Sequence, residues 1–523
     1  MNYADLLRVT LPETALELAA LLVLIVDLGF LRKAALKARA AVASLLGVAG
    51  CGAALWALQI QGNGWFSFTD GFGSTLLVTG AYIKAAQTGI LVLTALTLLL
   101  LFDSDFTKHV GEFVAVVLMA ATGGLLIAAA QDLLVIFVGL ELLSLGLYIM
   151  TAFTKSSGKS AEAALKYYLF GGMSTAFLLF GFSYFYGLSG STNLVQIQLA
   201  IAKSGPSPLF YFAWVLVIAG LGFKIAAVPF HLWAPDTYEG APAPAAAFIA
   251  SVSKVASFTL LLTLCQTWLI YEGSFGLVKS EADKILIHSG QTWLPLATIL
   301  LVVAAASMVV GNLAALAQVS VRRLLAYSAI AHVGYILLGV ATYPTYIGHD
   351  VSYLGALLPV IASAKAVLYY ILTYGLTTIG AFGVVSVVER ATGSDKLDAF
   401  LGLHKRNSIL AAVLLVLFLS LAGIPPLVGF WAKFNLFAAV LGVSAGPVPF
   451  ALVSLAVALS AVSLYYYLQV LKRAYVMPAV DESPIHAHPV MLAVLLLIAA
   501  AVVVLGCFPA LLQNWIASFY PAM

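Results

Sequence analysis

The chain has 523 residues, of which 63% are hydrophobic and only 9% are charged, and its mean hydropathy is +1.05. This composition excludes a soluble globular protein and is typical of a polytopic membrane protein. The net charge of +3 is small and scattered, so it does not indicate nucleic-acid binding. The three cysteines lie far apart, and no glycine-rich phosphate loop follows a strand pattern, so we expect no redox cofactor or metal in this chain.

Apolar runs of about 20 residues, the length that crosses a bilayer, recur along the whole chain. The first run leads into basic residues and lacks a basic segment before it, so we interpret it as a retained helix and not as a cleaved signal. No strands are expected. The sequence predicts an all-α fold with about fourteen transmembrane helices, at residues 14–31, 40–60, 82–102, 110–130, 133–153, 162–187, 209–231, 242–271, 293–316, 321–342, 354–388, 407–439, 449–472 and 489–511.

The distribution of lysine and arginine over the loops predicts the orientation of the chain. If the N-terminus is outside, the outer segments hold only Arg8, Lys84, Lys203, Lys279 and Lys284. Both termini are therefore predicted to face outward. The inner loops then hold Arg32, Lys33, Lys37, Arg39, Lys108, Lys155, Lys159, Arg322, Arg323, Arg390, Lys396, Lys405, Arg406, Lys472 and Arg473.

Five basic residues fall inside predicted spans, and all five are lysines: Lys166, Lys224, Lys254, Lys365 and Lys433. Lysine can release its proton when it is buried, whereas arginine cannot. This selection of lysine indicates proton handling. Lys166 and Lys365 lie near the starts of their spans, so the alternative to proton handling is that their side chains extend to the lipid headgroups.

The stretch GFKIAAVPFHLWAPDTYEGAPAP (222–244) carries Lys224 and is broken by four prolines. Irregular backbone and a lysine persist within a bilayer only when they are buried in protein or face water. His231 is seven residues after Lys224, so we expect both on one face. Glu141 is the only acid well inside a span, and Ser144 and Tyr148 share its predicted face. A purely structural Glu141–Lys224 pair is the alternative.

Three further positions combine an ionisable group with hydroxyl-bearing neighbours at helical spacing. Ser251 and Ser257 flank Lys254, and this arrangement can hold water beside an amine. His332 has Ser328 and Tyr335 on its face. The alternative is a structural role, because a buried histidine often only donates a hydrogen bond to a backbone carbonyl. Lys433 follows a second proline-rich break, GIPPLVGFWAK. Two other groups are interpreted as structural: Asp27 as an interfacial pair with Arg32 and Lys33, and Tyr465–Tyr467 as an aromatic belt.

A single offset near 200 residues relates three polar positions to three others. Pro229 and Pro425 are 196 residues apart (425 − 229), Lys166 and Lys365 are 199 apart (365 − 166), and Glu141 and His332 are 191 apart (332 − 141). Five helices, an odd number, separate the copies, so the sequence predicts two inverted repeats with broken helices 7 and 12. We expect an N-terminal unit at 1–109, the repeats at 110–272 and 273–474, and a last helix within 475–523.

At these residues the chain resembles the antiporter-like membrane subunits of respiratory complex I, and most closely subunit N of the bacterial proton-translocating NADH–quinone oxidoreductase. The resemblance covers nearly the whole chain. The stretches that carry it are LPETALELAALLVLIVDL (11–28), GFKIAAVPFHLWAPDTYEGAPAPAAAFIASVSKVA (222–256), RRLLAYSAIAHVGYILLG (322–339) and LAGIPPLVGFWAKF (421–434).

The resemblance implies a role for each of these residues. Glu141 is similar to the fifth-helix carboxylate that pairs with the seventh-helix lysine, here Lys224. Lys254 is similar to the central lysine and Lys433 to the exit lysine of proton translocation. Lys166 is similar to a lysine near the pair and His332 to a histidine of the polar axis. Lys365 rests mainly on the repeat offset.

The resemblance further implies a proton-pumping membrane-arm subunit of the bacterial inner membrane. Its partners would be neighbouring antiporter-like and small membrane subunits, and FMN, iron–sulfur clusters, NADH and quinone would bind in other subunits. The alternatives are a subunit of a multi-component sodium/proton antiporter or of a membrane-bound hydrogenase, and a membrane spacer that has lost transport. A further alternative is a self-contained membrane enzyme, but the sequence shows no recognisable metal or nucleophile constellation for one.

Overall fold

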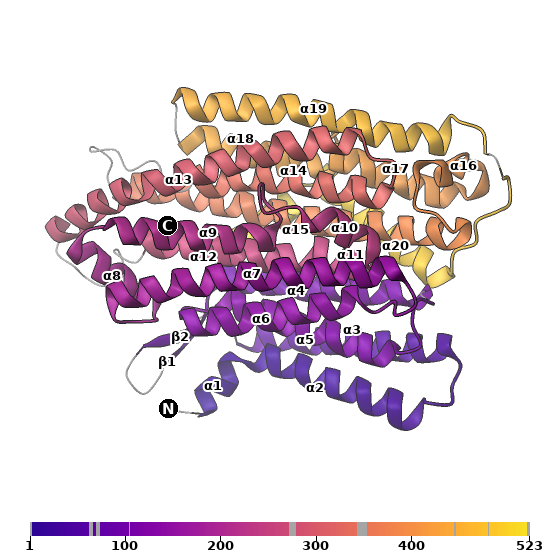
Figure 1. Ribbon diagram of the computed structural model, residues 1–523, viewed down its shortest axis with the longest axis horizontal. Coiled ribbons are helices and arrows are strands. Elements are labelled where there is room, and N and C mark those ends of the chain that lie inside the picture. Colours follow the sequence, from indigo (N-terminus) through magenta and orange to yellow (C-terminus); the bar gives the residue numbers. More distant parts are fainter. Residues whose placement is uncertain are drawn as a thin grey trace.

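The computed structural model describes residues 3–61, 66–69, 74–103, 105–270, 279–342, 353–443, 446–479 and 481–519. Within these ranges twelve helices are long and apolar enough to cross a membrane. They lie side by side with roughly aligned axes in one bundle (Figure 1). The all-α polytopic fold is therefore confirmed.

The helices follow the predicted spans in chain order. The N-terminal part contains α1 (Tyr3–Val9), α2 (Leu11–Ile25), α3 (Leu36–Ile60) and α4 (Ala81–Leu99). The next part contains α5 (Val110–Ala129), α6 (Leu133–Thr151), α7 (Gly158–Ser189), α8 (Leu194–Ser204), α9 (Pro208–Ile225), α10 (Trp233–Gly240), α11 (Ala243–Ala250) and α12 (Val252–Ile270). The remainder contains α13 (Lys279–Leu316), α14 (Val321–Thr342), α15 (Tyr353–Thr392), α16 (Leu403–Arg406), α17 (Ser408–Ala422), α18 (Val428–Val443), α19 (Pro447–Tyr475), α20 (Pro489–Cys507) and α21 (Ala510–Ser518).

Two of the fourteen predicted spans contain no helix long enough to meet the length criterion, which explains why twelve helices meet it. The first span is α2, which continues as a π-helical turn over Val26–Phe30. The twelfth is divided between α17 and α18.

A small hairpin of strands β1 (Phe66–Thr69) and β2 (Thr75–Thr79) corrects the expectation that the chain has no strands. The strands pair antiparallel beside the start of α4, at the same end of the bundle as α1 and α8 (Figure 1). Strands of four and five residues are too short to stand out as long apolar runs in the sequence. The buried side chains of Phe68 and Leu77 anchor the hairpin.

The interior of the bundle is formed by α11, α12 and α14. In the most apolar window of the α11–α12 span every residue is buried, and 94% are buried in α14. The corresponding share is only 33% in α7 and 22% in α19. Because apolar helices can cover the outside at no cost in lipid, this arrangement reserves the enclosed positions for polar side chains.

Both predicted breaks are present, and each begins with a left-handed residue. Helix α9 ends at Ile225, where Ala226 has φ +62°, and α17 ends at Ala422, where Gly423 has φ +89°. Each break contains a cis peptide bond before a proline, at Pro229 and at Pro426.

The first break corrects the expectation that Lys224 and His231 share a helical face. Helix α9 ends one residue after Lys224, and His231 lies in the turns that lead to α10. A spacing of seven residues places two side chains on one face only if the helix continues through Pro229, but the chain leaves the helix three residues before that proline. A third break, at Ser251 between α11 and α12, was not predicted.

Candidate functional site

Lys224 lies in the last turn of α9 with its side chain enclosed by α6. Its Nζ donates a hydrogen bond of 2.6 Å to Ser144 Oγ, and it lies 5.9 Å from the ring centre of Tyr148. Both contacts come from the face of α6 that was predicted to carry Glu141. The Glu141 carboxylate accepts a bond of 2.7 Å from Thr175 Oγ1 and is close enough to attract Lys224 electrostatically. Among the described residues no ion pair joins the two directly.

Lys254 lies on α12 in the most enclosed part of the bundle. Its Nζ donates to the Ala329 carbonyl of α14 at 3.2 Å and lies 5.6 Å from the ring centre of Tyr374 on α15. In the part of the chain that the structure describes, no carboxylate acts on this lysine. Its surroundings are therefore neutral and polarisable.

Lys433 lies on α18 beside the second break. Its Nζ donates to the Ala422 carbonyl at 2.8 Å and to Ser460 Oγ of α19 at 2.6 Å. The carbonyl is exposed because Gly423 leaves the helix there in a left-handed conformation that glycine adopts without strain. A Cβ at Gly423 would come within 3.0 Å of Lys433 Cδ, so the glycine also makes room for the lysine.

His332 and three tyrosines fill the space between Lys254 and Lys433. His332 Nδ1 and Tyr370 Oη are 2.8 Å apart. The His332 ring lies 4.7 Å from the ring of Tyr374, which faces Lys254, and 5.7 Å from the ring of Tyr335. Lys433 Nζ in turn lies 5.4 Å from the ring centre of Tyr335. A continuous series of polar and aromatic side chains thus joins the two lysines.

Hydrogen bonds fix this series from the side of α13 and α19. Asn312 Nδ2 donates to Tyr335 Oη at 3.0 Å, and Tyr466 Oη donates to Asn312 Oδ1 at 3.3 Å. Ser328 Oγ and Tyr467 Oη are also bonded. The interpretation of Tyr465–Tyr467 as an aromatic belt is therefore wrong for two of the three residues. Tyr466 and Tyr467 are buried, and only Tyr465, which is 58% exposed, faces outward.

The other predicted supporting residues are placed less centrally. Ser251 Oγ donates to the Ala247 carbonyl at 2.6 Å, so it serves the break in the helix, and Ser257 is buried with no hydrogen-bond partner among the described residues. His231 is half-buried between α9 and α10, and Lys365 is half-buried on α15.

Lys166 belongs to a charged cluster between α7, α10 and α14. Its Nζ contacts Glu162 at 2.6 Å and Asp236 at 2.7 Å, and Asp236 also pairs with Arg323 at 2.6 Å. Burial alone would raise the pKa of Asp236, which lies outside the membrane spans. The hydrogen bonds and charges of Lys166 and Arg323 outweigh burial and hold that pKa below its usual value. Asp27 also has another partner than predicted, since Arg39 contacts it at 2.6 Å.

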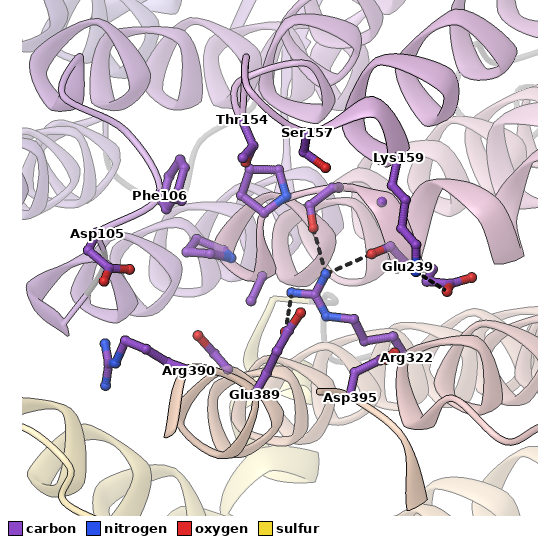
Figure 2. Close-up of a pocket in the computed structure, with 16 residues that line it drawn as sticks. Asp105, Phe106, Thr154, Ser157, Lys159, Glu239, Arg322, Glu389, Arg390 and Asp395 are labelled. Carbon is purple, nitrogen blue, oxygen red and sulfur yellow. Dashed lines mark hydrogen bonds and ion pairs between the residues drawn. The ribbon is translucent and has the colours of Figure 1, made fainter. Parts of the chain in front are cut away.

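A cavity of about 300 Å³ lies where α10, α11 and α15 meet. Arg322 crosses it, donating to the carbonyls of Glu239 and Ala241 at 2.9 and 2.7 Å and pairing with Glu389 at 3.0 Å (Figure 2). Lys159 pairs with Glu239 at the rim. This polar cavity was not predicted, because its residues are far apart in the sequence and each resembles an ordinary loop charge.

The sequence also did not single out the tyrosines of α15 or Asn312. Tyrosine is common at membrane interfaces, so identity alone did not mark Tyr370 and Tyr374 as interior. Their position in the middle of a 40-residue helix was the available signal. Among the described residues no group of three or more His, Cys, Asp or Glu side chains is placed to hold a metal.

The family model described as "NADH:quinone oxidoreductase/Mrp antiporter, TM" matches residues 130–278 and 284–462. The chain belongs to this family. The matched residues include Glu141, Lys224, Lys254, His332 and Lys433, so the site lies inside the family's common region. They end before α20, and they begin after the N-terminal helices α1–α5.

Relatives of the chain extend beyond that common region. It is 46% identical to NADH-quinone oxidoreductase subunit N 2 of Acidobacterium capsulatum, with 99% of each chain covered. It is 39% identical to NADH-quinone oxidoreductase subunit N 1 of Roseiflexus castenholzii over 85% of this chain and 81% of that protein. The resemblance stated from the sequence is therefore confirmed.

Solved structures share the fold. A chain of respiratory complex I from Thermus thermophilus with bound aureothin superposes with a TM-score of 0.74 at 31% identity, covering 96% of this chain and 98% of that one. A chain of the Mrp complex from Dietzia sp. gives 0.75 at 21% identity, with 97% and 96% covered. Because the second identity is only 21%, that match shows a shared fold and nothing more.

Proposed function

We propose that this chain is a proton-translocating membrane-arm subunit of an NADH–quinone oxidoreductase. The observation that carries the proposal is the pair of enclosed lysines, Lys254 and Lys433, joined by His332 and tyrosines. A buried ammonium costs several kcal/mol unless it is paired or used. Neither lysine has an ionised partner among the described residues, so proton exchange is the use that fits them.

Lys224 and Glu141 have a different role in this proposal. Glu141 stabilises the charged form of Lys224, and Ser144 holds the ammonium beside it. When the distance between the two charges changes, the field at Lys254 changes with it. At an effective dielectric constant of about 20, unit charges about 4 Å apart interact by roughly 4 kcal/mol, which is enough to move a proton between sites.

The proton route in this proposal runs from Lys254 along Tyr374, His332 and Tyr335 to Lys433. The ring carbons cannot carry a proton, so the hydroxyl groups and the imidazole carry it. Each of these groups has a partner that orients it. Lys166, His231, Lys365, Ser251 and Ser257 are supporting residues. The cavity around Arg322 offers a polar approach to α11 and hence to Lys254.

The orientation, the division into repeats and the assembly belong to the same proposal. We place the Arg322 cavity on the inner side of a bacterial inner membrane and both termini outside, because the basic loops cluster around that cavity. The repeats extend over 110–272 and 273–474, after an N-terminal unit at 1–109 and before a last helix in 475–523. FMN, iron–sulfur clusters, NADH and quinone would bind in other subunits of the complex, beside neighbouring membrane subunits.

The test is purification of the chain from its native membrane in mild detergent, followed by reconstitution into vesicles with a pH-sensitive dye. Co-purification of flavin and iron–sulfur subunits, with NADH-driven acidification, is the expected result. Sodium movement driven by a pH gradient, with only other hydrophobic chains present, would instead favour the antiporter alternative. Hydrogen chemistry would favour a membrane-bound hydrogenase, and assembly with no lysine-dependent pumping would favour a spacer.

A further inference from the structure

Another buried ionisable group lies in the N-terminal helices. It is outside the lysine series, by which we mean Lys254, Lys433 and the polar and aromatic side chains that join them. Glu13 is in the first turn of α2, and only 4% of the residue is exposed. Its Oε1 accepts a hydrogen bond of 3.3 Å from Gln87 Nε2 of α4. Its Oε2 has no hydrogen-bond partner among the described residues. A buried carboxylate with one free oxygen is costly in its charged form.

Gln87 connects this carboxyl group to two further helices. The same Nε2 lies 3.3 Å from the Leu125 carbonyl of α5, so Gln87 orients its amide between α2 and α5. One turn earlier on α4 is Lys84, which is 4% exposed and whose Nζ has no hydrogen-bond partner in the described part of the chain. The first turns of α2 and α4 thus carry a buried acid and a buried amine, and Gln87 binds the acid.

This group lies near an aqueous face and near the helix of Lys254. The first turns of α2 and α4 are at the end of the bundle that carries α1 and the hairpin (Figure 1), the proposed outer side. Tyr82 Oη of α4 is 3.1 Å from Thr263 Oγ1 of α12. A Cβ at Gly124, the residue before Leu125, would lie 3.5 Å from Ala256 Cβ, so α5 packs closely against α12.

We propose that Glu13 is a proton-binding site that exchanges protons with the outer aqueous phase. The carboxylate takes up one proton at Oε2 to become the neutral acid and later returns that proton to the outer phase, which restores the carboxylate. Gln87 holds Oε1 in place in both states.

A proton fits this site better than a metal ion does. The described residues provide a single carboxylate and one amide here, and no group of three His, Cys, Asp or Glu side chains that could hold a metal. Mg²⁺ and Ca²⁺ need six or more oxygen ligands.

The helices around Glu13 carry other ionisable groups. Glu17 is one turn further on α2 but is exposed, which makes it a matched control. The same end of the bundle carries Asp5 and Arg8 on α1 and Tyr82 and Lys84 on α4. Helix α3 also carries Cys51. Three more charged groups lie toward the opposite end: Lys37 and Arg39 on α3 and Glu112 on α5.

The experiment is infrared difference spectroscopy of the intact complex in lipid vesicles after a change of pH, without substrate. We expect a carbonyl-stretch band of a protonated carboxylic acid that is lost in Glu13→Gln and kept in Glu17→Gln. A spectrum of Glu13→Gln that equals the unmodified complex would overturn the proposal. Because no turnover is needed, the result is independent of whether the lysine series pumps protons.

A second variant keeps the test decisive if Glu13→Gln does not assemble. Gln87→Leu removes the bond to Oε1 but leaves the carboxyl group, so the same band should remain and change its frequency and its titration midpoint. An unchanged band would overturn the assignment. The band should also respond to a pH change on the outer side of sealed vesicles within the mixing time, and a response to the inner side only would overturn the proposed direction of exchange.

Discussion

Lys224 and Lys254 are both buried lysines near helix breaks, yet their surroundings differ in one respect. Lys224 has a carboxylate nearby, since Glu141 is on the same helix as its hydrogen-bond partner Ser144. Among the described residues Lys254 contacts a backbone carbonyl and an aromatic ring, and Lys433 contacts a carbonyl, a hydroxyl and an aromatic ring. The described part of the chain therefore provides a counter-charge for Lys224 and none for Lys254 or Lys433.

This difference separates two tasks that one residue type can perform. A lysine beside a carboxylate is held charged and acts on its surroundings through its field. A lysine among neutral acceptors gains little by keeping its charge, so it is suited to carry a proton. The lysines of the second kind, Lys254 and Lys433, are also the two that His332 and the tyrosines connect.

The strongest test of this separation is Lys254→Arg. Arginine keeps the positive charge, but its solution pKa is more than about 2 units higher, so its neutral form is roughly 100-fold rarer. We expect proton pumping in vesicles to fall by a comparable factor. The control is Lys159→Arg at the exposed rim of the cavity, which should pump normally. Normal pumping by Lys254→Arg would make the residue a fixed charge, like Lys224.

Glu141→Gln tests the counter-charge from the other side of the comparison. The amide keeps the shape and the bond from Thr175 but removes the negative charge that acts on Lys224. We expect pumping to fall about tenfold, which corresponds to a loss of about 1.4 kcal/mol. Lys224→Ala should lower it at least as much, with the complex still assembled on native gels. Full pumping by both variants would contradict the paired-charge role.

Tyr370→Phe tests the connection between the lysines. It removes the hydroxyl that lies 2.8 Å from His332 Nδ1 and leaves the ring in place. A lost hydrogen bond of this kind costs about 1 kcal/mol, so we expect a decrease in pumping of several-fold. Tyr465→Phe changes an exposed tyrosine and is the matched control. Equal rates for the two variants would show that the proton route does not depend on the bond between Tyr370 and His332.

The smallest expected effect concerns the cluster around Lys166, outside the lysine series. Since the pKa of Asp236 is lowered in the folded chain, its contribution to stability is present above its unfolded value and is lost as the pH falls through the folded value. Asp236→Asn should lower the free energy of unfolding by about 1 kcal/mol near neutral pH. Thermal unfolding in detergent should show this difference disappearing below about pH 4. A difference that persists in acid would assign the loss to packing.

Hydropathy predicted the membrane helices because twenty apolar residues have few alternatives to crossing a bilayer. The polar residues within them, Lys254, His332 and Lys433, could be recognised for the same reason, since each is costly in lipid. What could not be predicted depends on where helices stop and how they meet. His231 leaves the face of Lys224 because the chain turns at Ala226, and Tyr466 and Tyr467 are interior because α19 faces Asn312 and Ser328.

The enclosure of α12 up to Cys265 has a consequence for how the chain is made. Helix α12 is covered on several sides by α4, α5 and α9, which the ribosome delivers before it, and by α14 and α15, which follow. Lys254 bonds to α14 and faces the Tyr374 ring of α15, so neither contact can form until these later helices have been synthesised. A nascent chain that ends between α12 and α15 therefore lacks one or both of the helices that contact this amine.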